Sequence, residues 1–201
     1  MGVVGLGTGT LACYAKPGQQ WRFYEIDPAM ETIARDPKRF TFLSACLPGV
    51  PVSIGDARLT LARETDAPFD VLVIDAFSSD AVPMHLLTRE AFEIYRRRLA
   101  PGGVLLVHVS NRYLELEPVV AAAAGWGWHL AMRDYAPGID GPLKSYSNSH
   151  WVALTRDRAT LDGLVARSGR EKWAAMESRK GFGGWTDDFA SILPVIKWRV
   201  P

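Results

Sequence analysis

The sequence lacks a strong charge bias, and this argues against one large class of partner. Its 23 lysines and arginines nearly balance 22 aspartates and glutamates, which gives a net charge of +1. A protein that binds nucleic acid through its phosphates carries a basic patch or a clear basic excess. The dense basic run at 96–98 falls where a helix is expected to end, and cations there complement the helix dipole. We therefore expect no nucleic-acid partner.

Cysteine, long apolar runs and metal-ligand spacings are also scarce. Cys13 and Cys46 are isolated and form no CxxC pair, so we expect reduced, buried thiols in a cytoplasmic protein. No apolar run approaches the ~18 residues that a membrane span needs, and no basic-then-apolar leader opens the sequence. Four histidines show no ligand spacing, so we expect them on the surface or in the core and predict no metal. They are His85, His108, His129 and His150.

Seven short apolar segments alternate with helix-like segments, which is typical of a parallel sheet covered on both faces. The expected strands are residues 2–6, 21–26, 52–54, 69–74, 104–109, 128–132 and 151–154. The expected helices begin near 11 and at 28 and cover 57–64, 88–99 and 114–124. The pattern predicts an α/β fold with a Rossmann-like, doubly wound, mostly parallel seven-stranded sheet. We expect one domain built on this sheet over 1–155 and a C-terminal helical extension packing on it over 156–201.

Glycines follow the first expected strand, where a ligand can approach the backbone closely. The run GLGTG places Gly5, Gly7 and Gly9 between a strand and a helix. Glycine lets the chain turn sharply there, and the helix N-terminus presents unpaired N–H groups. Glu25 lies 20 positions after Gly5 at the end of the next strand, the spacing at which an acid reaches ribose hydroxyls. A solvent-facing acid is the alternative, and we favour the ribose role because Glu25 is a second matching element.

Acids also follow the third and fourth expected strands. Asp56 either accepts hydrogen bonds from an adenine amino group or caps the helix that begins at Ala57. Asp75 and Asp80 bound the loop DAFSSD after the fourth strand, where the ligand crevice of an open α/β sheet lies. Two carboxylates in one loop suit a site that binds a cation or takes up a proton. Ser and Asp also favour capping turns, which is the alternative interpretation.

Two aromatic positions complete the candidates. Tyr113, just past the fifth strand, either lines the crevice or caps the sheet edge. Near the C-terminus, Trp185 precedes two adjacent acids, Asp187 and Asp188. An aromatic beside paired carboxylates could recognise an amine, but an exposed helix start is the preferred interpretation.

Five motifs over residues 2–113 resemble, in order and spacing, those of the polyamine aminopropyltransferases, the spermidine synthase family. They are GLGTG, YEIDP, GDAR, IDAFSSD and LAPGGV. The resemblance is closest to bacterial spermidine-synthase-like domains that are often fused to a transporter module. It implies a sheet of the class I S-adenosylmethionine-dependent methyltransferase type. The cofactor contacts that it implies are Gly5, Gly7, Thr8, Gly9, Glu25, Ile26, Asp56, Ala57 and Asp75.

The same resemblance assigns the chemistry to the loop after the fourth strand. Asp75 and Asp80 match the two acids of the family's catalytic loop, with the later acid as base, and Asp80 and Tyr113 would contact the substrate. Two extra residues separate Asp75 from Ser-Ser-Asp here. Thr8 stands where the family usually carries an acid that binds the amino group of the aminopropyl tail. The family's N-terminal β-rich domain has no counterpart, so we expect it to be absent.

The resemblance implies transfer of the aminopropyl group of decarboxylated S-adenosylmethionine to a polyamine acceptor such as putrescine. Ordinary S-adenosylmethionine is the alternative co-substrate, and a class I methyltransferase is the rival activity. A non-catalytic nucleoside-binding module is the third alternative, because one sheet of this type hosts many activities. We expect a small-molecule amine as substrate and a homodimer as the assembly to test.

Overall fold

The computed structural model describes residues 1–76, 83–135, 149–167 and 173–198. Through these residues runs one eight-stranded sheet in the order β3-β2-β1-β4-β5-β7-β6-β8. The strands are β1 (Gly2–Val4), β2 (Arg22–Glu25), β3 (Val52–Ile54), β4 (Phe69–Ile74), β5 (Leu99–His108), β6 (His129–Tyr135), β7 (Ser149–Thr155) and β8 (Ala174–Ala175). The α-helices are α1 (Pro28–Arg35), α2 (Phe42–Cys46), α3 (Ala57–Arg63), α4 (Arg89–Arg98), α5 (Glu117–Ala121) and α6 (Arg158–Arg167). The 3-10 helices are η1 (Thr10–Tyr14), η2 (Met84–Leu86), η3 (Ala122–Trp126) and η4 (Leu193–Val195). None of the helices in these ranges is long and apolar enough to cross a membrane.

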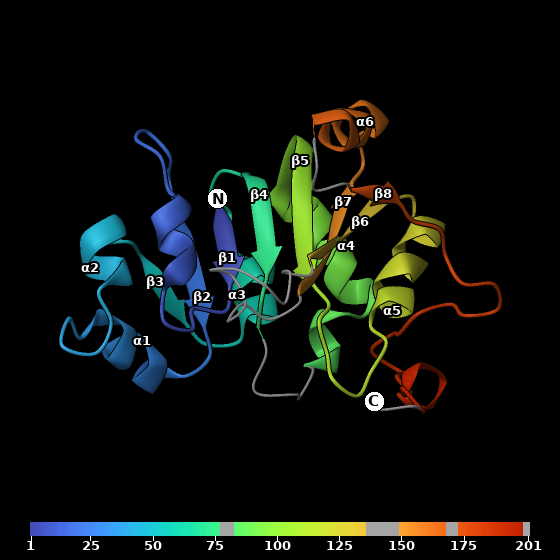
Figure 1. Ribbon diagram of the computed structural model, residues 1–201, viewed down its shortest axis with the longest axis horizontal. Coiled ribbons are helices and arrows are strands. Elements are labelled where there is room, and N and C mark those ends of the chain that lie inside the picture. The colour runs from blue at the N-terminus through green and yellow to red at the C-terminus, as the bar shows by residue number, and fades with distance from the viewer. Residues whose placement is uncertain (77–82, 136–148, 168–172, 199–201) are drawn as a thin grey trace, which may run out of the picture.

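The order of the strands creates a switch point at the middle of the sheet. Pairing is parallel from β3 through β2, β1 and β4 to β5, and antiparallel beyond β5. The chain moves from β1 outward to β3 and then returns to place β4 on the other side of β1. In open α/β sheets, ligands bind outside the carboxyl ends of the strands at such a reversal. These ends of β4 and β5 point to the lower edge in Figure 1.

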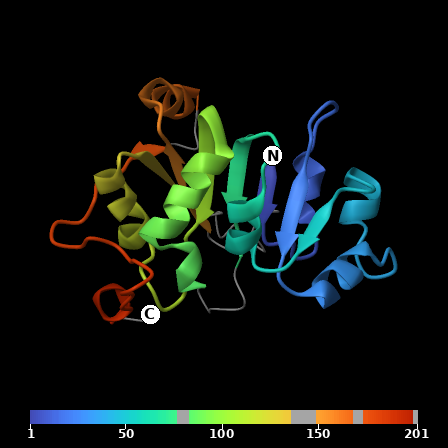
Figure 2. The same cartoon turned by 180° about the vertical axis from the view of Figure 1, so that it is seen from behind.

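Helices cover both faces of the sheet, because buried parallel strands send apolar side chains alternately to each face. On one face, Val3, Phe23 and Val73 pack with buried residues of η1, α1 and α2. On the other face, Val4 and Ile74 pack with buried residues of α3, α4 and α5. Helices α1 and α2 lie in front of the sheet in Figure 1, and α3 and α4 lie in front of it in Figure 2. This is the doubly wound arrangement that the sequence predicts.

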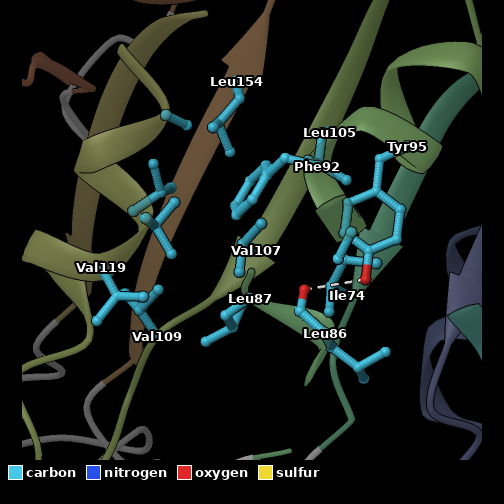
Figure 3. Close-up of a cluster of buried hydrophobic side chains, with 14 of the residues drawn as sticks. Ile74, Leu86, Leu87, Phe92, Tyr95, Leu105, Val107, Val109, Val119 and Leu154 are labelled. Carbon is cyan, nitrogen blue, oxygen red and sulfur yellow. Dashed lines mark hydrogen bonds between the residues drawn. The ribbon is translucent and has the colours of Figure 1, made fainter. Parts of the chain in front are cut away.

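The larger core anchors the chain that returns to the sheet after the β4 loop. Figure 3 shows Phe92 and Tyr95 of α4 pointing toward β5, where Leu105 and Val107 belong to the same buried cluster. The Tyr95 hydroxyl donates a hydrogen bond to the carbonyl oxygen of Leu86, at 3.0 Å. Complete burial raises the pKa of Tyr95, so this donor stays protonated. The contact fixes η2, the short helix that precedes α4, against the larger core.

The predicted strands and helices occur in the predicted order, with several local differences, among them the unpredicted helix α2. An eighth strand, β8, pairs with Ala131 and Met132 of β6. The helix expected from residue 11 is the short η1, because Pro17 disfavours helical geometry at the residue before it. The strand expected from residue 104 begins at Leu99 as β5, and its register against β4 shifts between Phe69 and Val71. Local patterns therefore located most of the elements but not all of their ends.

The described residues after β7 form helix α6, strand β8, irregular chain and the short helix η4. Helix α6 and strand β8 are followed by a segment that reaches the carboxyl edge of the sheet, at the lower right of Figure 1. Trp185 is 1% exposed and forms a bridge with Thr88, and Ile196 forms one with Leu114. The Trp185 indole N–H donates to the carbonyl oxygen of Ser191 at 2.9 Å. A domain boundary at residue 155 stays a prediction.

The expectation of reduced, buried cysteines is wrong. Cys13 of η1 and Cys46 of α2 form a disulfide, with their Cα atoms 4.8 Å apart, and both residues are exposed. The sequence could not reveal the pair, because the two residues are 33 positions apart and meet only through the packing of η1 against α2. Disulfides are rare in the reducing cytosol. The cysteines therefore no longer argue for a cytoplasmic location.

Candidate functional site

The sequence-predicted residues within the described ranges lie mainly along the carboxyl edge of the parallel strands. The register places the ends of β2, β1, β4 and β5 side by side in that order. Glu25 ends β2, Gly5 follows β1, Asp75 follows β4 and His108 ends β5, so they share this edge. Asp56 follows β3 at the next position outward, where the Gly55 N–H donates to the Glu25 carbonyl oxygen at 2.8 Å. The structure thus brings the predicted loop and three acids to one edge.

The glycine loop lies directly against the backbone that follows β4. Gly5 has a φ of 95°, and a Cβ on it would lie 2.2 Å from the carbonyl oxygen of Asp75. Gly9, with a φ of 85°, faces Leu43 on α2, where a Cβ would lie 2.7 Å from a side-chain carbon. Gly7 has a φ of 50°, but a Cβ there would meet nothing within 4 Å. Packing therefore requires glycine at positions 5 and 9, whereas Gly7 borders open space.

Glu25 ties the glycine loop to the start of α1. Its Oε2 accepts a hydrogen bond from the Leu6 N–H and its Oε1 accepts one from the Asp27 N–H, both at 3.0 Å. An ionised carboxylate has about four acceptor positions, so two remain for hydroxyl donors such as those of a ribose. The side chain therefore has a structural role that the sequence did not predict, and it keeps capacity for the predicted one. Thr8 is half-buried in the loop, and Ile26 is 68% exposed beside Glu25.

Asp56 performs the capping role that was one of its two interpretations. Its Oδ1 accepts a hydrogen bond from the Leu59 N–H at 2.9 Å and so caps α3. Its Oδ2 lies 3.1 Å from Nε2 of His85. Ala57, the first residue of α3, is buried in the larger core. A contact from Asp56 or Ala57 to an adenine ring stays a prediction.

A hydrogen-bonded chain that the sequence did not predict begins at Asp75. Its Oδ1 lies 2.8 Å from Nδ1 of His108, and Nε2 of His108 lies 2.8 Å from the hydroxyl of Ser110. The same hydroxyl accepts a hydrogen bond from the His150 N–H at 2.8 Å. The His108 ring stacks on Trp151, with ring centres 4.7 Å apart and planes at 15°. The available signal was positional: His108 ends the strand beside the one that Asp75 follows.

Two predicted substrate contacts have different outcomes. Tyr113 is 45% exposed, and its carbonyl oxygen accepts a hydrogen bond from the Lys197 N–H at 2.8 Å. Its ring lies 5.5 Å from the guanidinium of Arg112. The C-terminal segment therefore holds the Tyr113 backbone while the ring remains accessible. Asp80, the predicted base, lies outside the described residues.

Asp187 joins the C-terminal segment to the first turn of α3. Its carboxylate forms a bidentate ion pair with Arg58, in which Oδ1 lies 2.7 Å from Nη1. It also accepts a hydrogen bond from the Thr88 hydroxyl at 2.8 Å. The hydrogen bond from Arg58 holds the pKa of Asp187 below its usual value. The helix start expected at this position is wrong, because the chain after buried Trp185 is irregular.

Two surface hollows are not lined by any of the predicted site residues that the structure describes. One of about 610 Å³ is lined by α4, Arg58, Trp126 and Trp128. The other, of about 1000 Å³, lies at the amino ends of the central strands, beside Met1 and Phe69. Topology therefore locates the candidate site better than surface shape does. In the part of the chain that the structure describes, no group of three or more His, Cys, Asp or Glu side chains could hold a metal ion.

Comparisons of sequence relate the chain to one enzyme class. No protein-family model matches it. A probable polyamine aminopropyl transferase of Bifidobacterium longum is 31% identical over 111 residues, which cover 54% of this chain and 23% of that protein. A polyamine aminopropyltransferase of Vibrio vulnificus is 30% identical over 111 residues, which cover 53% of this chain and 36% of that protein. The chain therefore matches well under half the length of either relative.

Comparisons of structure establish the fold. A probable spermidine synthase from Corynebacterium glutamicum has a TM-score of 0.64 at 19% identity, covering 94% of this chain and 72% of that one. An O-methyltransferase from Streptomyces achromogenes, solved in complex with S-adenosylmethionine, has a TM-score of 0.51 at 18% identity, covering 78% and 72%. The sheet is thus the one shared by spermidine synthases and class I methyltransferases. The chain is therefore similar in its matched sequence to polyamine aminopropyltransferases, and in its fold to a spermidine synthase and an O-methyltransferase.

Proposed function

We propose that this chain is the nucleoside-binding catalytic part of an aminopropyltransferase of polyamine biosynthesis. The observation that carries the proposal is that the chain is more similar in sequence to aminopropyl transferases than to a methyltransferase of the same fold. Both curated relatives, at 30% and 31% identity, are named as aminopropyl transferases of polyamines. The methyltransferase resembles the chain at 18% identity and supports the fold alone. Sequence similarity therefore favours aminopropyl transfer over methyl transfer.

The glycine loop and Glu25 have the properties that a bound nucleoside requires. Gly5 brings the loop against the backbone after β4, and Gly7 leaves room for a ligand to approach the main chain. Glu25 keeps acceptor positions for ribose hydroxyls, and Asp56 lies at the neighbouring strand end, where the adenine ring would follow the sugar. We propose decarboxylated S-adenosylmethionine as the co-substrate. It supplies an electrophilic carbon beside a positively charged sulfur.

The proposed reaction forms one C–N bond and breaks one C–S bond. The nitrogen of the acceptor amine attacks the carbon next to sulfur, and the electron pair of the broken bond leaves with methylthioadenosine, a neutral thioether. A free alkylamine has a pKa near ~10, like that of lysine, so it must lose a proton before it can attack. We propose Asp80 as the group that accepts this proton and Asp75 as the group that orients the amine or the sulfonium. Putrescine is the acceptor that we would test first.

A class I methyltransferase is the second candidate, and Thr8 favours it. The half-buried threonine offers a hydroxyl but no negative charge to the amino group of an aminopropyl tail. The related family usually carries an acid at this position. Without it, the loop lacks one contact that would favour decarboxylated S-adenosylmethionine over S-adenosylmethionine. The two candidates therefore differ in which of two closely related ligands binds more tightly.

Calorimetric titration with decarboxylated S-adenosylmethionine, S-adenosylmethionine and methylthioadenosine separates the candidates. Aminopropyl transfer predicts tight binding of the first and the third ligand. Tighter binding of S-adenosylmethionine than of its decarboxylated form would favour the methyltransferase. If none of the three binds to folded protein, the proposal is wrong.

Turnover is then measured by mass spectrometry with putrescine and longer diamines. The expected products are methylthioadenosine and an aminopropylated amine in equal amounts. Binding without any product from either co-substrate would indicate a non-catalytic nucleoside-binding module. Light scattering on the same samples tests whether the protein is a homodimer.

A further inference from the structure

His108 is held at both ring nitrogens and on one ring face. Nδ1 lies 2.8 Å from Oδ1 of Asp75, Nε2 lies 2.8 Å from the Ser110 hydroxyl, and Trp151 stacks on the ring. The side chain of His108 is 23% exposed and that of Asp75 is 31% exposed. Packing against Trp151 does not by itself require a hydrogen-bond partner at each ring nitrogen, so this arrangement indicates a further role for His108.

The hydrogen bonds also define which nitrogen carries the proton. An ionised carboxylate only accepts hydrogen bonds, so Nδ1 of His108 donates to Asp75. The Ser110 hydroxyl already accepts the His150 N–H at 2.8 Å, and its own proton can be donated to Nε2. This assignment follows from the partners on each side. The Nδ1–H of His108 therefore points at one oxygen of Asp75.

The contact with His108 occupies one carboxylate oxygen of Asp75 and leaves the other for a ligand. Its backbone N–H donates to the Val4 carbonyl oxygen at 2.8 Å, which fixes the main chain, and His108 engages Oδ1. Among the described residues, Oδ2 of Asp75 makes no hydrogen bond. Because Gly5 lies against the Asp75 carbonyl, the carboxylate is located where the glycine loop and β4 meet. One oxygen is thus fixed while the other remains for a ligand.

We infer that His108 is a positioning residue for Asp75 in the proposed aminopropyl transfer. Its Nδ1–H holds the carboxylate in one rotamer through Oδ1, and it leaves Oδ2 to orient the amine or the sulfonium. This inference rests on the proposed function, and it assigns a role to a histidine that no sequence motif marks. A displacement of about 1 Å at a reacting centre costs on the order of 100-fold in rate.

Two substitutions at position 108 separate positioning from packing. His108→Phe keeps an aromatic ring on Trp151 but removes the N–H donor to Asp75. His108→Gln loses the ring but keeps an N–H donor. If His108 positions Asp75, we expect kcat to fall about 100-fold in the Phe variant, with KM for the nucleoside nearly unchanged, and to recover at least about 10-fold in the Gln variant. The reverse order of activities would show a packing role and overturn the inference.

A double-mutant cycle tests whether His108 acts through Asp75. In an Asp75→Ala background, His108→Phe is expected to change kcat less than about 3-fold, because the group that it positions is gone. The matched control is His150→Phe, which removes the N–H donor of a second histidine–aspartate pair, His150 Nδ1 to Asp134 Oδ1 at 2.7 Å, on the next strands. The control should leave kcat within about 3-fold of the parent. Equal losses in both backgrounds would refute action through Asp75.

A measurement without turnover keeps the inference separate from the proposed function. In nitrogen-15 NMR, the His108 ring is expected to show a proton on Nδ1 that is protected from exchange, and this signal should be lost in Asp75→Ala but kept in His150→Phe. An unchanged His108 signal in Asp75→Ala would overturn the inference whatever the activity. An intact pair in a protein that transfers no aminopropyl group to any amine would overturn the proposed function alone.

Discussion

The substitution Gly5→Ala tests the contact on which the site depends. The new methyl group would lie 2.2 Å from the Asp75 carbonyl oxygen and 2.7 Å from its carbonyl carbon, and both are backbone atoms that cannot rotate away. The φ of 95° also disfavours any residue with a Cβ. Ordinary contact begins near 3.4 Å, so the loop must move by about 1 Å away from the end of β4.

The expected loss in the free energy of unfolding is the sum of a conformational cost and an overpacking cost. A left-handed backbone conformation costs an alanine about 1–2 kcal/mol, and overpacking in a closely packed region costs about 1–3 kcal/mol more. We therefore expect Gly5→Ala to lower the free energy of unfolding by about 2–5 kcal/mol. Gly7→Ala is the matched control, because its φ is 50° but its Cβ would meet nothing within 4 Å. It should cost only the conformational part, about 1–2 kcal/mol.

Urea denaturation of the two variants and the parent measures these differences, and calorimetry with methylthioadenosine measures their effect on the site. We expect Gly5→Ala to weaken ligand binding more than its stability loss alone would suggest, because the loop is displaced in the folded state as well. Equal destabilisation by Gly5→Ala and Gly7→Ala would refute the reasoning, since it would mean that the loop does not lie against Asp75.

Three further predictions address other contacts of the edge. Glu25→Gln replaces one of two acceptor oxygens that bind backbone N–H groups, so stability should fall by about 1–3 kcal/mol; an unchanged urea midpoint would contradict the bridging role. Reduction of the Cys13–Cys46 disulfide, which joins residues 33 positions apart, should cost about 3–4 kcal/mol by chain entropy and lower Tm by roughly 10 °C, with Cys13→Ser in oxidising buffer giving the same Tm as the reduced parent. Arg58 lowers the pKa of Asp187, so the stabilisation is present above the unfolded value near ~3.9 and is lost as pH falls through the lower folded value. Tryptophan fluorescence should therefore report loosening of the C-terminal segment below about pH 4, and Asp187→Asn should be loosened already at neutral pH.

Much of the candidate site could be read from the chain because its signals are local. Gly5 and Glu25 are recognisable from a strand, a glycine turn and a fixed spacing, and the structure places both at the predicted edge. Asp75 is recognisable because an acid directly follows an apolar strand. His108 was missed for the opposite reason: nothing around it in the sequence differs from an ordinary strand end. Its significance comes from the neighbouring strand, whose identity depends on the order of strands in the sheet.

The sequence by itself determined the alternation of strands and helices, because the apolar segments and the turn residues between them act over a few positions. It also determined the order of the glycine loop and the acids along the chain. Only the tertiary structure decided which distant residues meet. Asp75 and His108 are 33 positions apart, Cys13 and Cys46 are also 33 apart, and Arg58 and Asp187 are 129 apart. Such pairs depend on strand order and helix packing, which arise from the burial of many side chains at once and leave no signal in the local pattern of either partner.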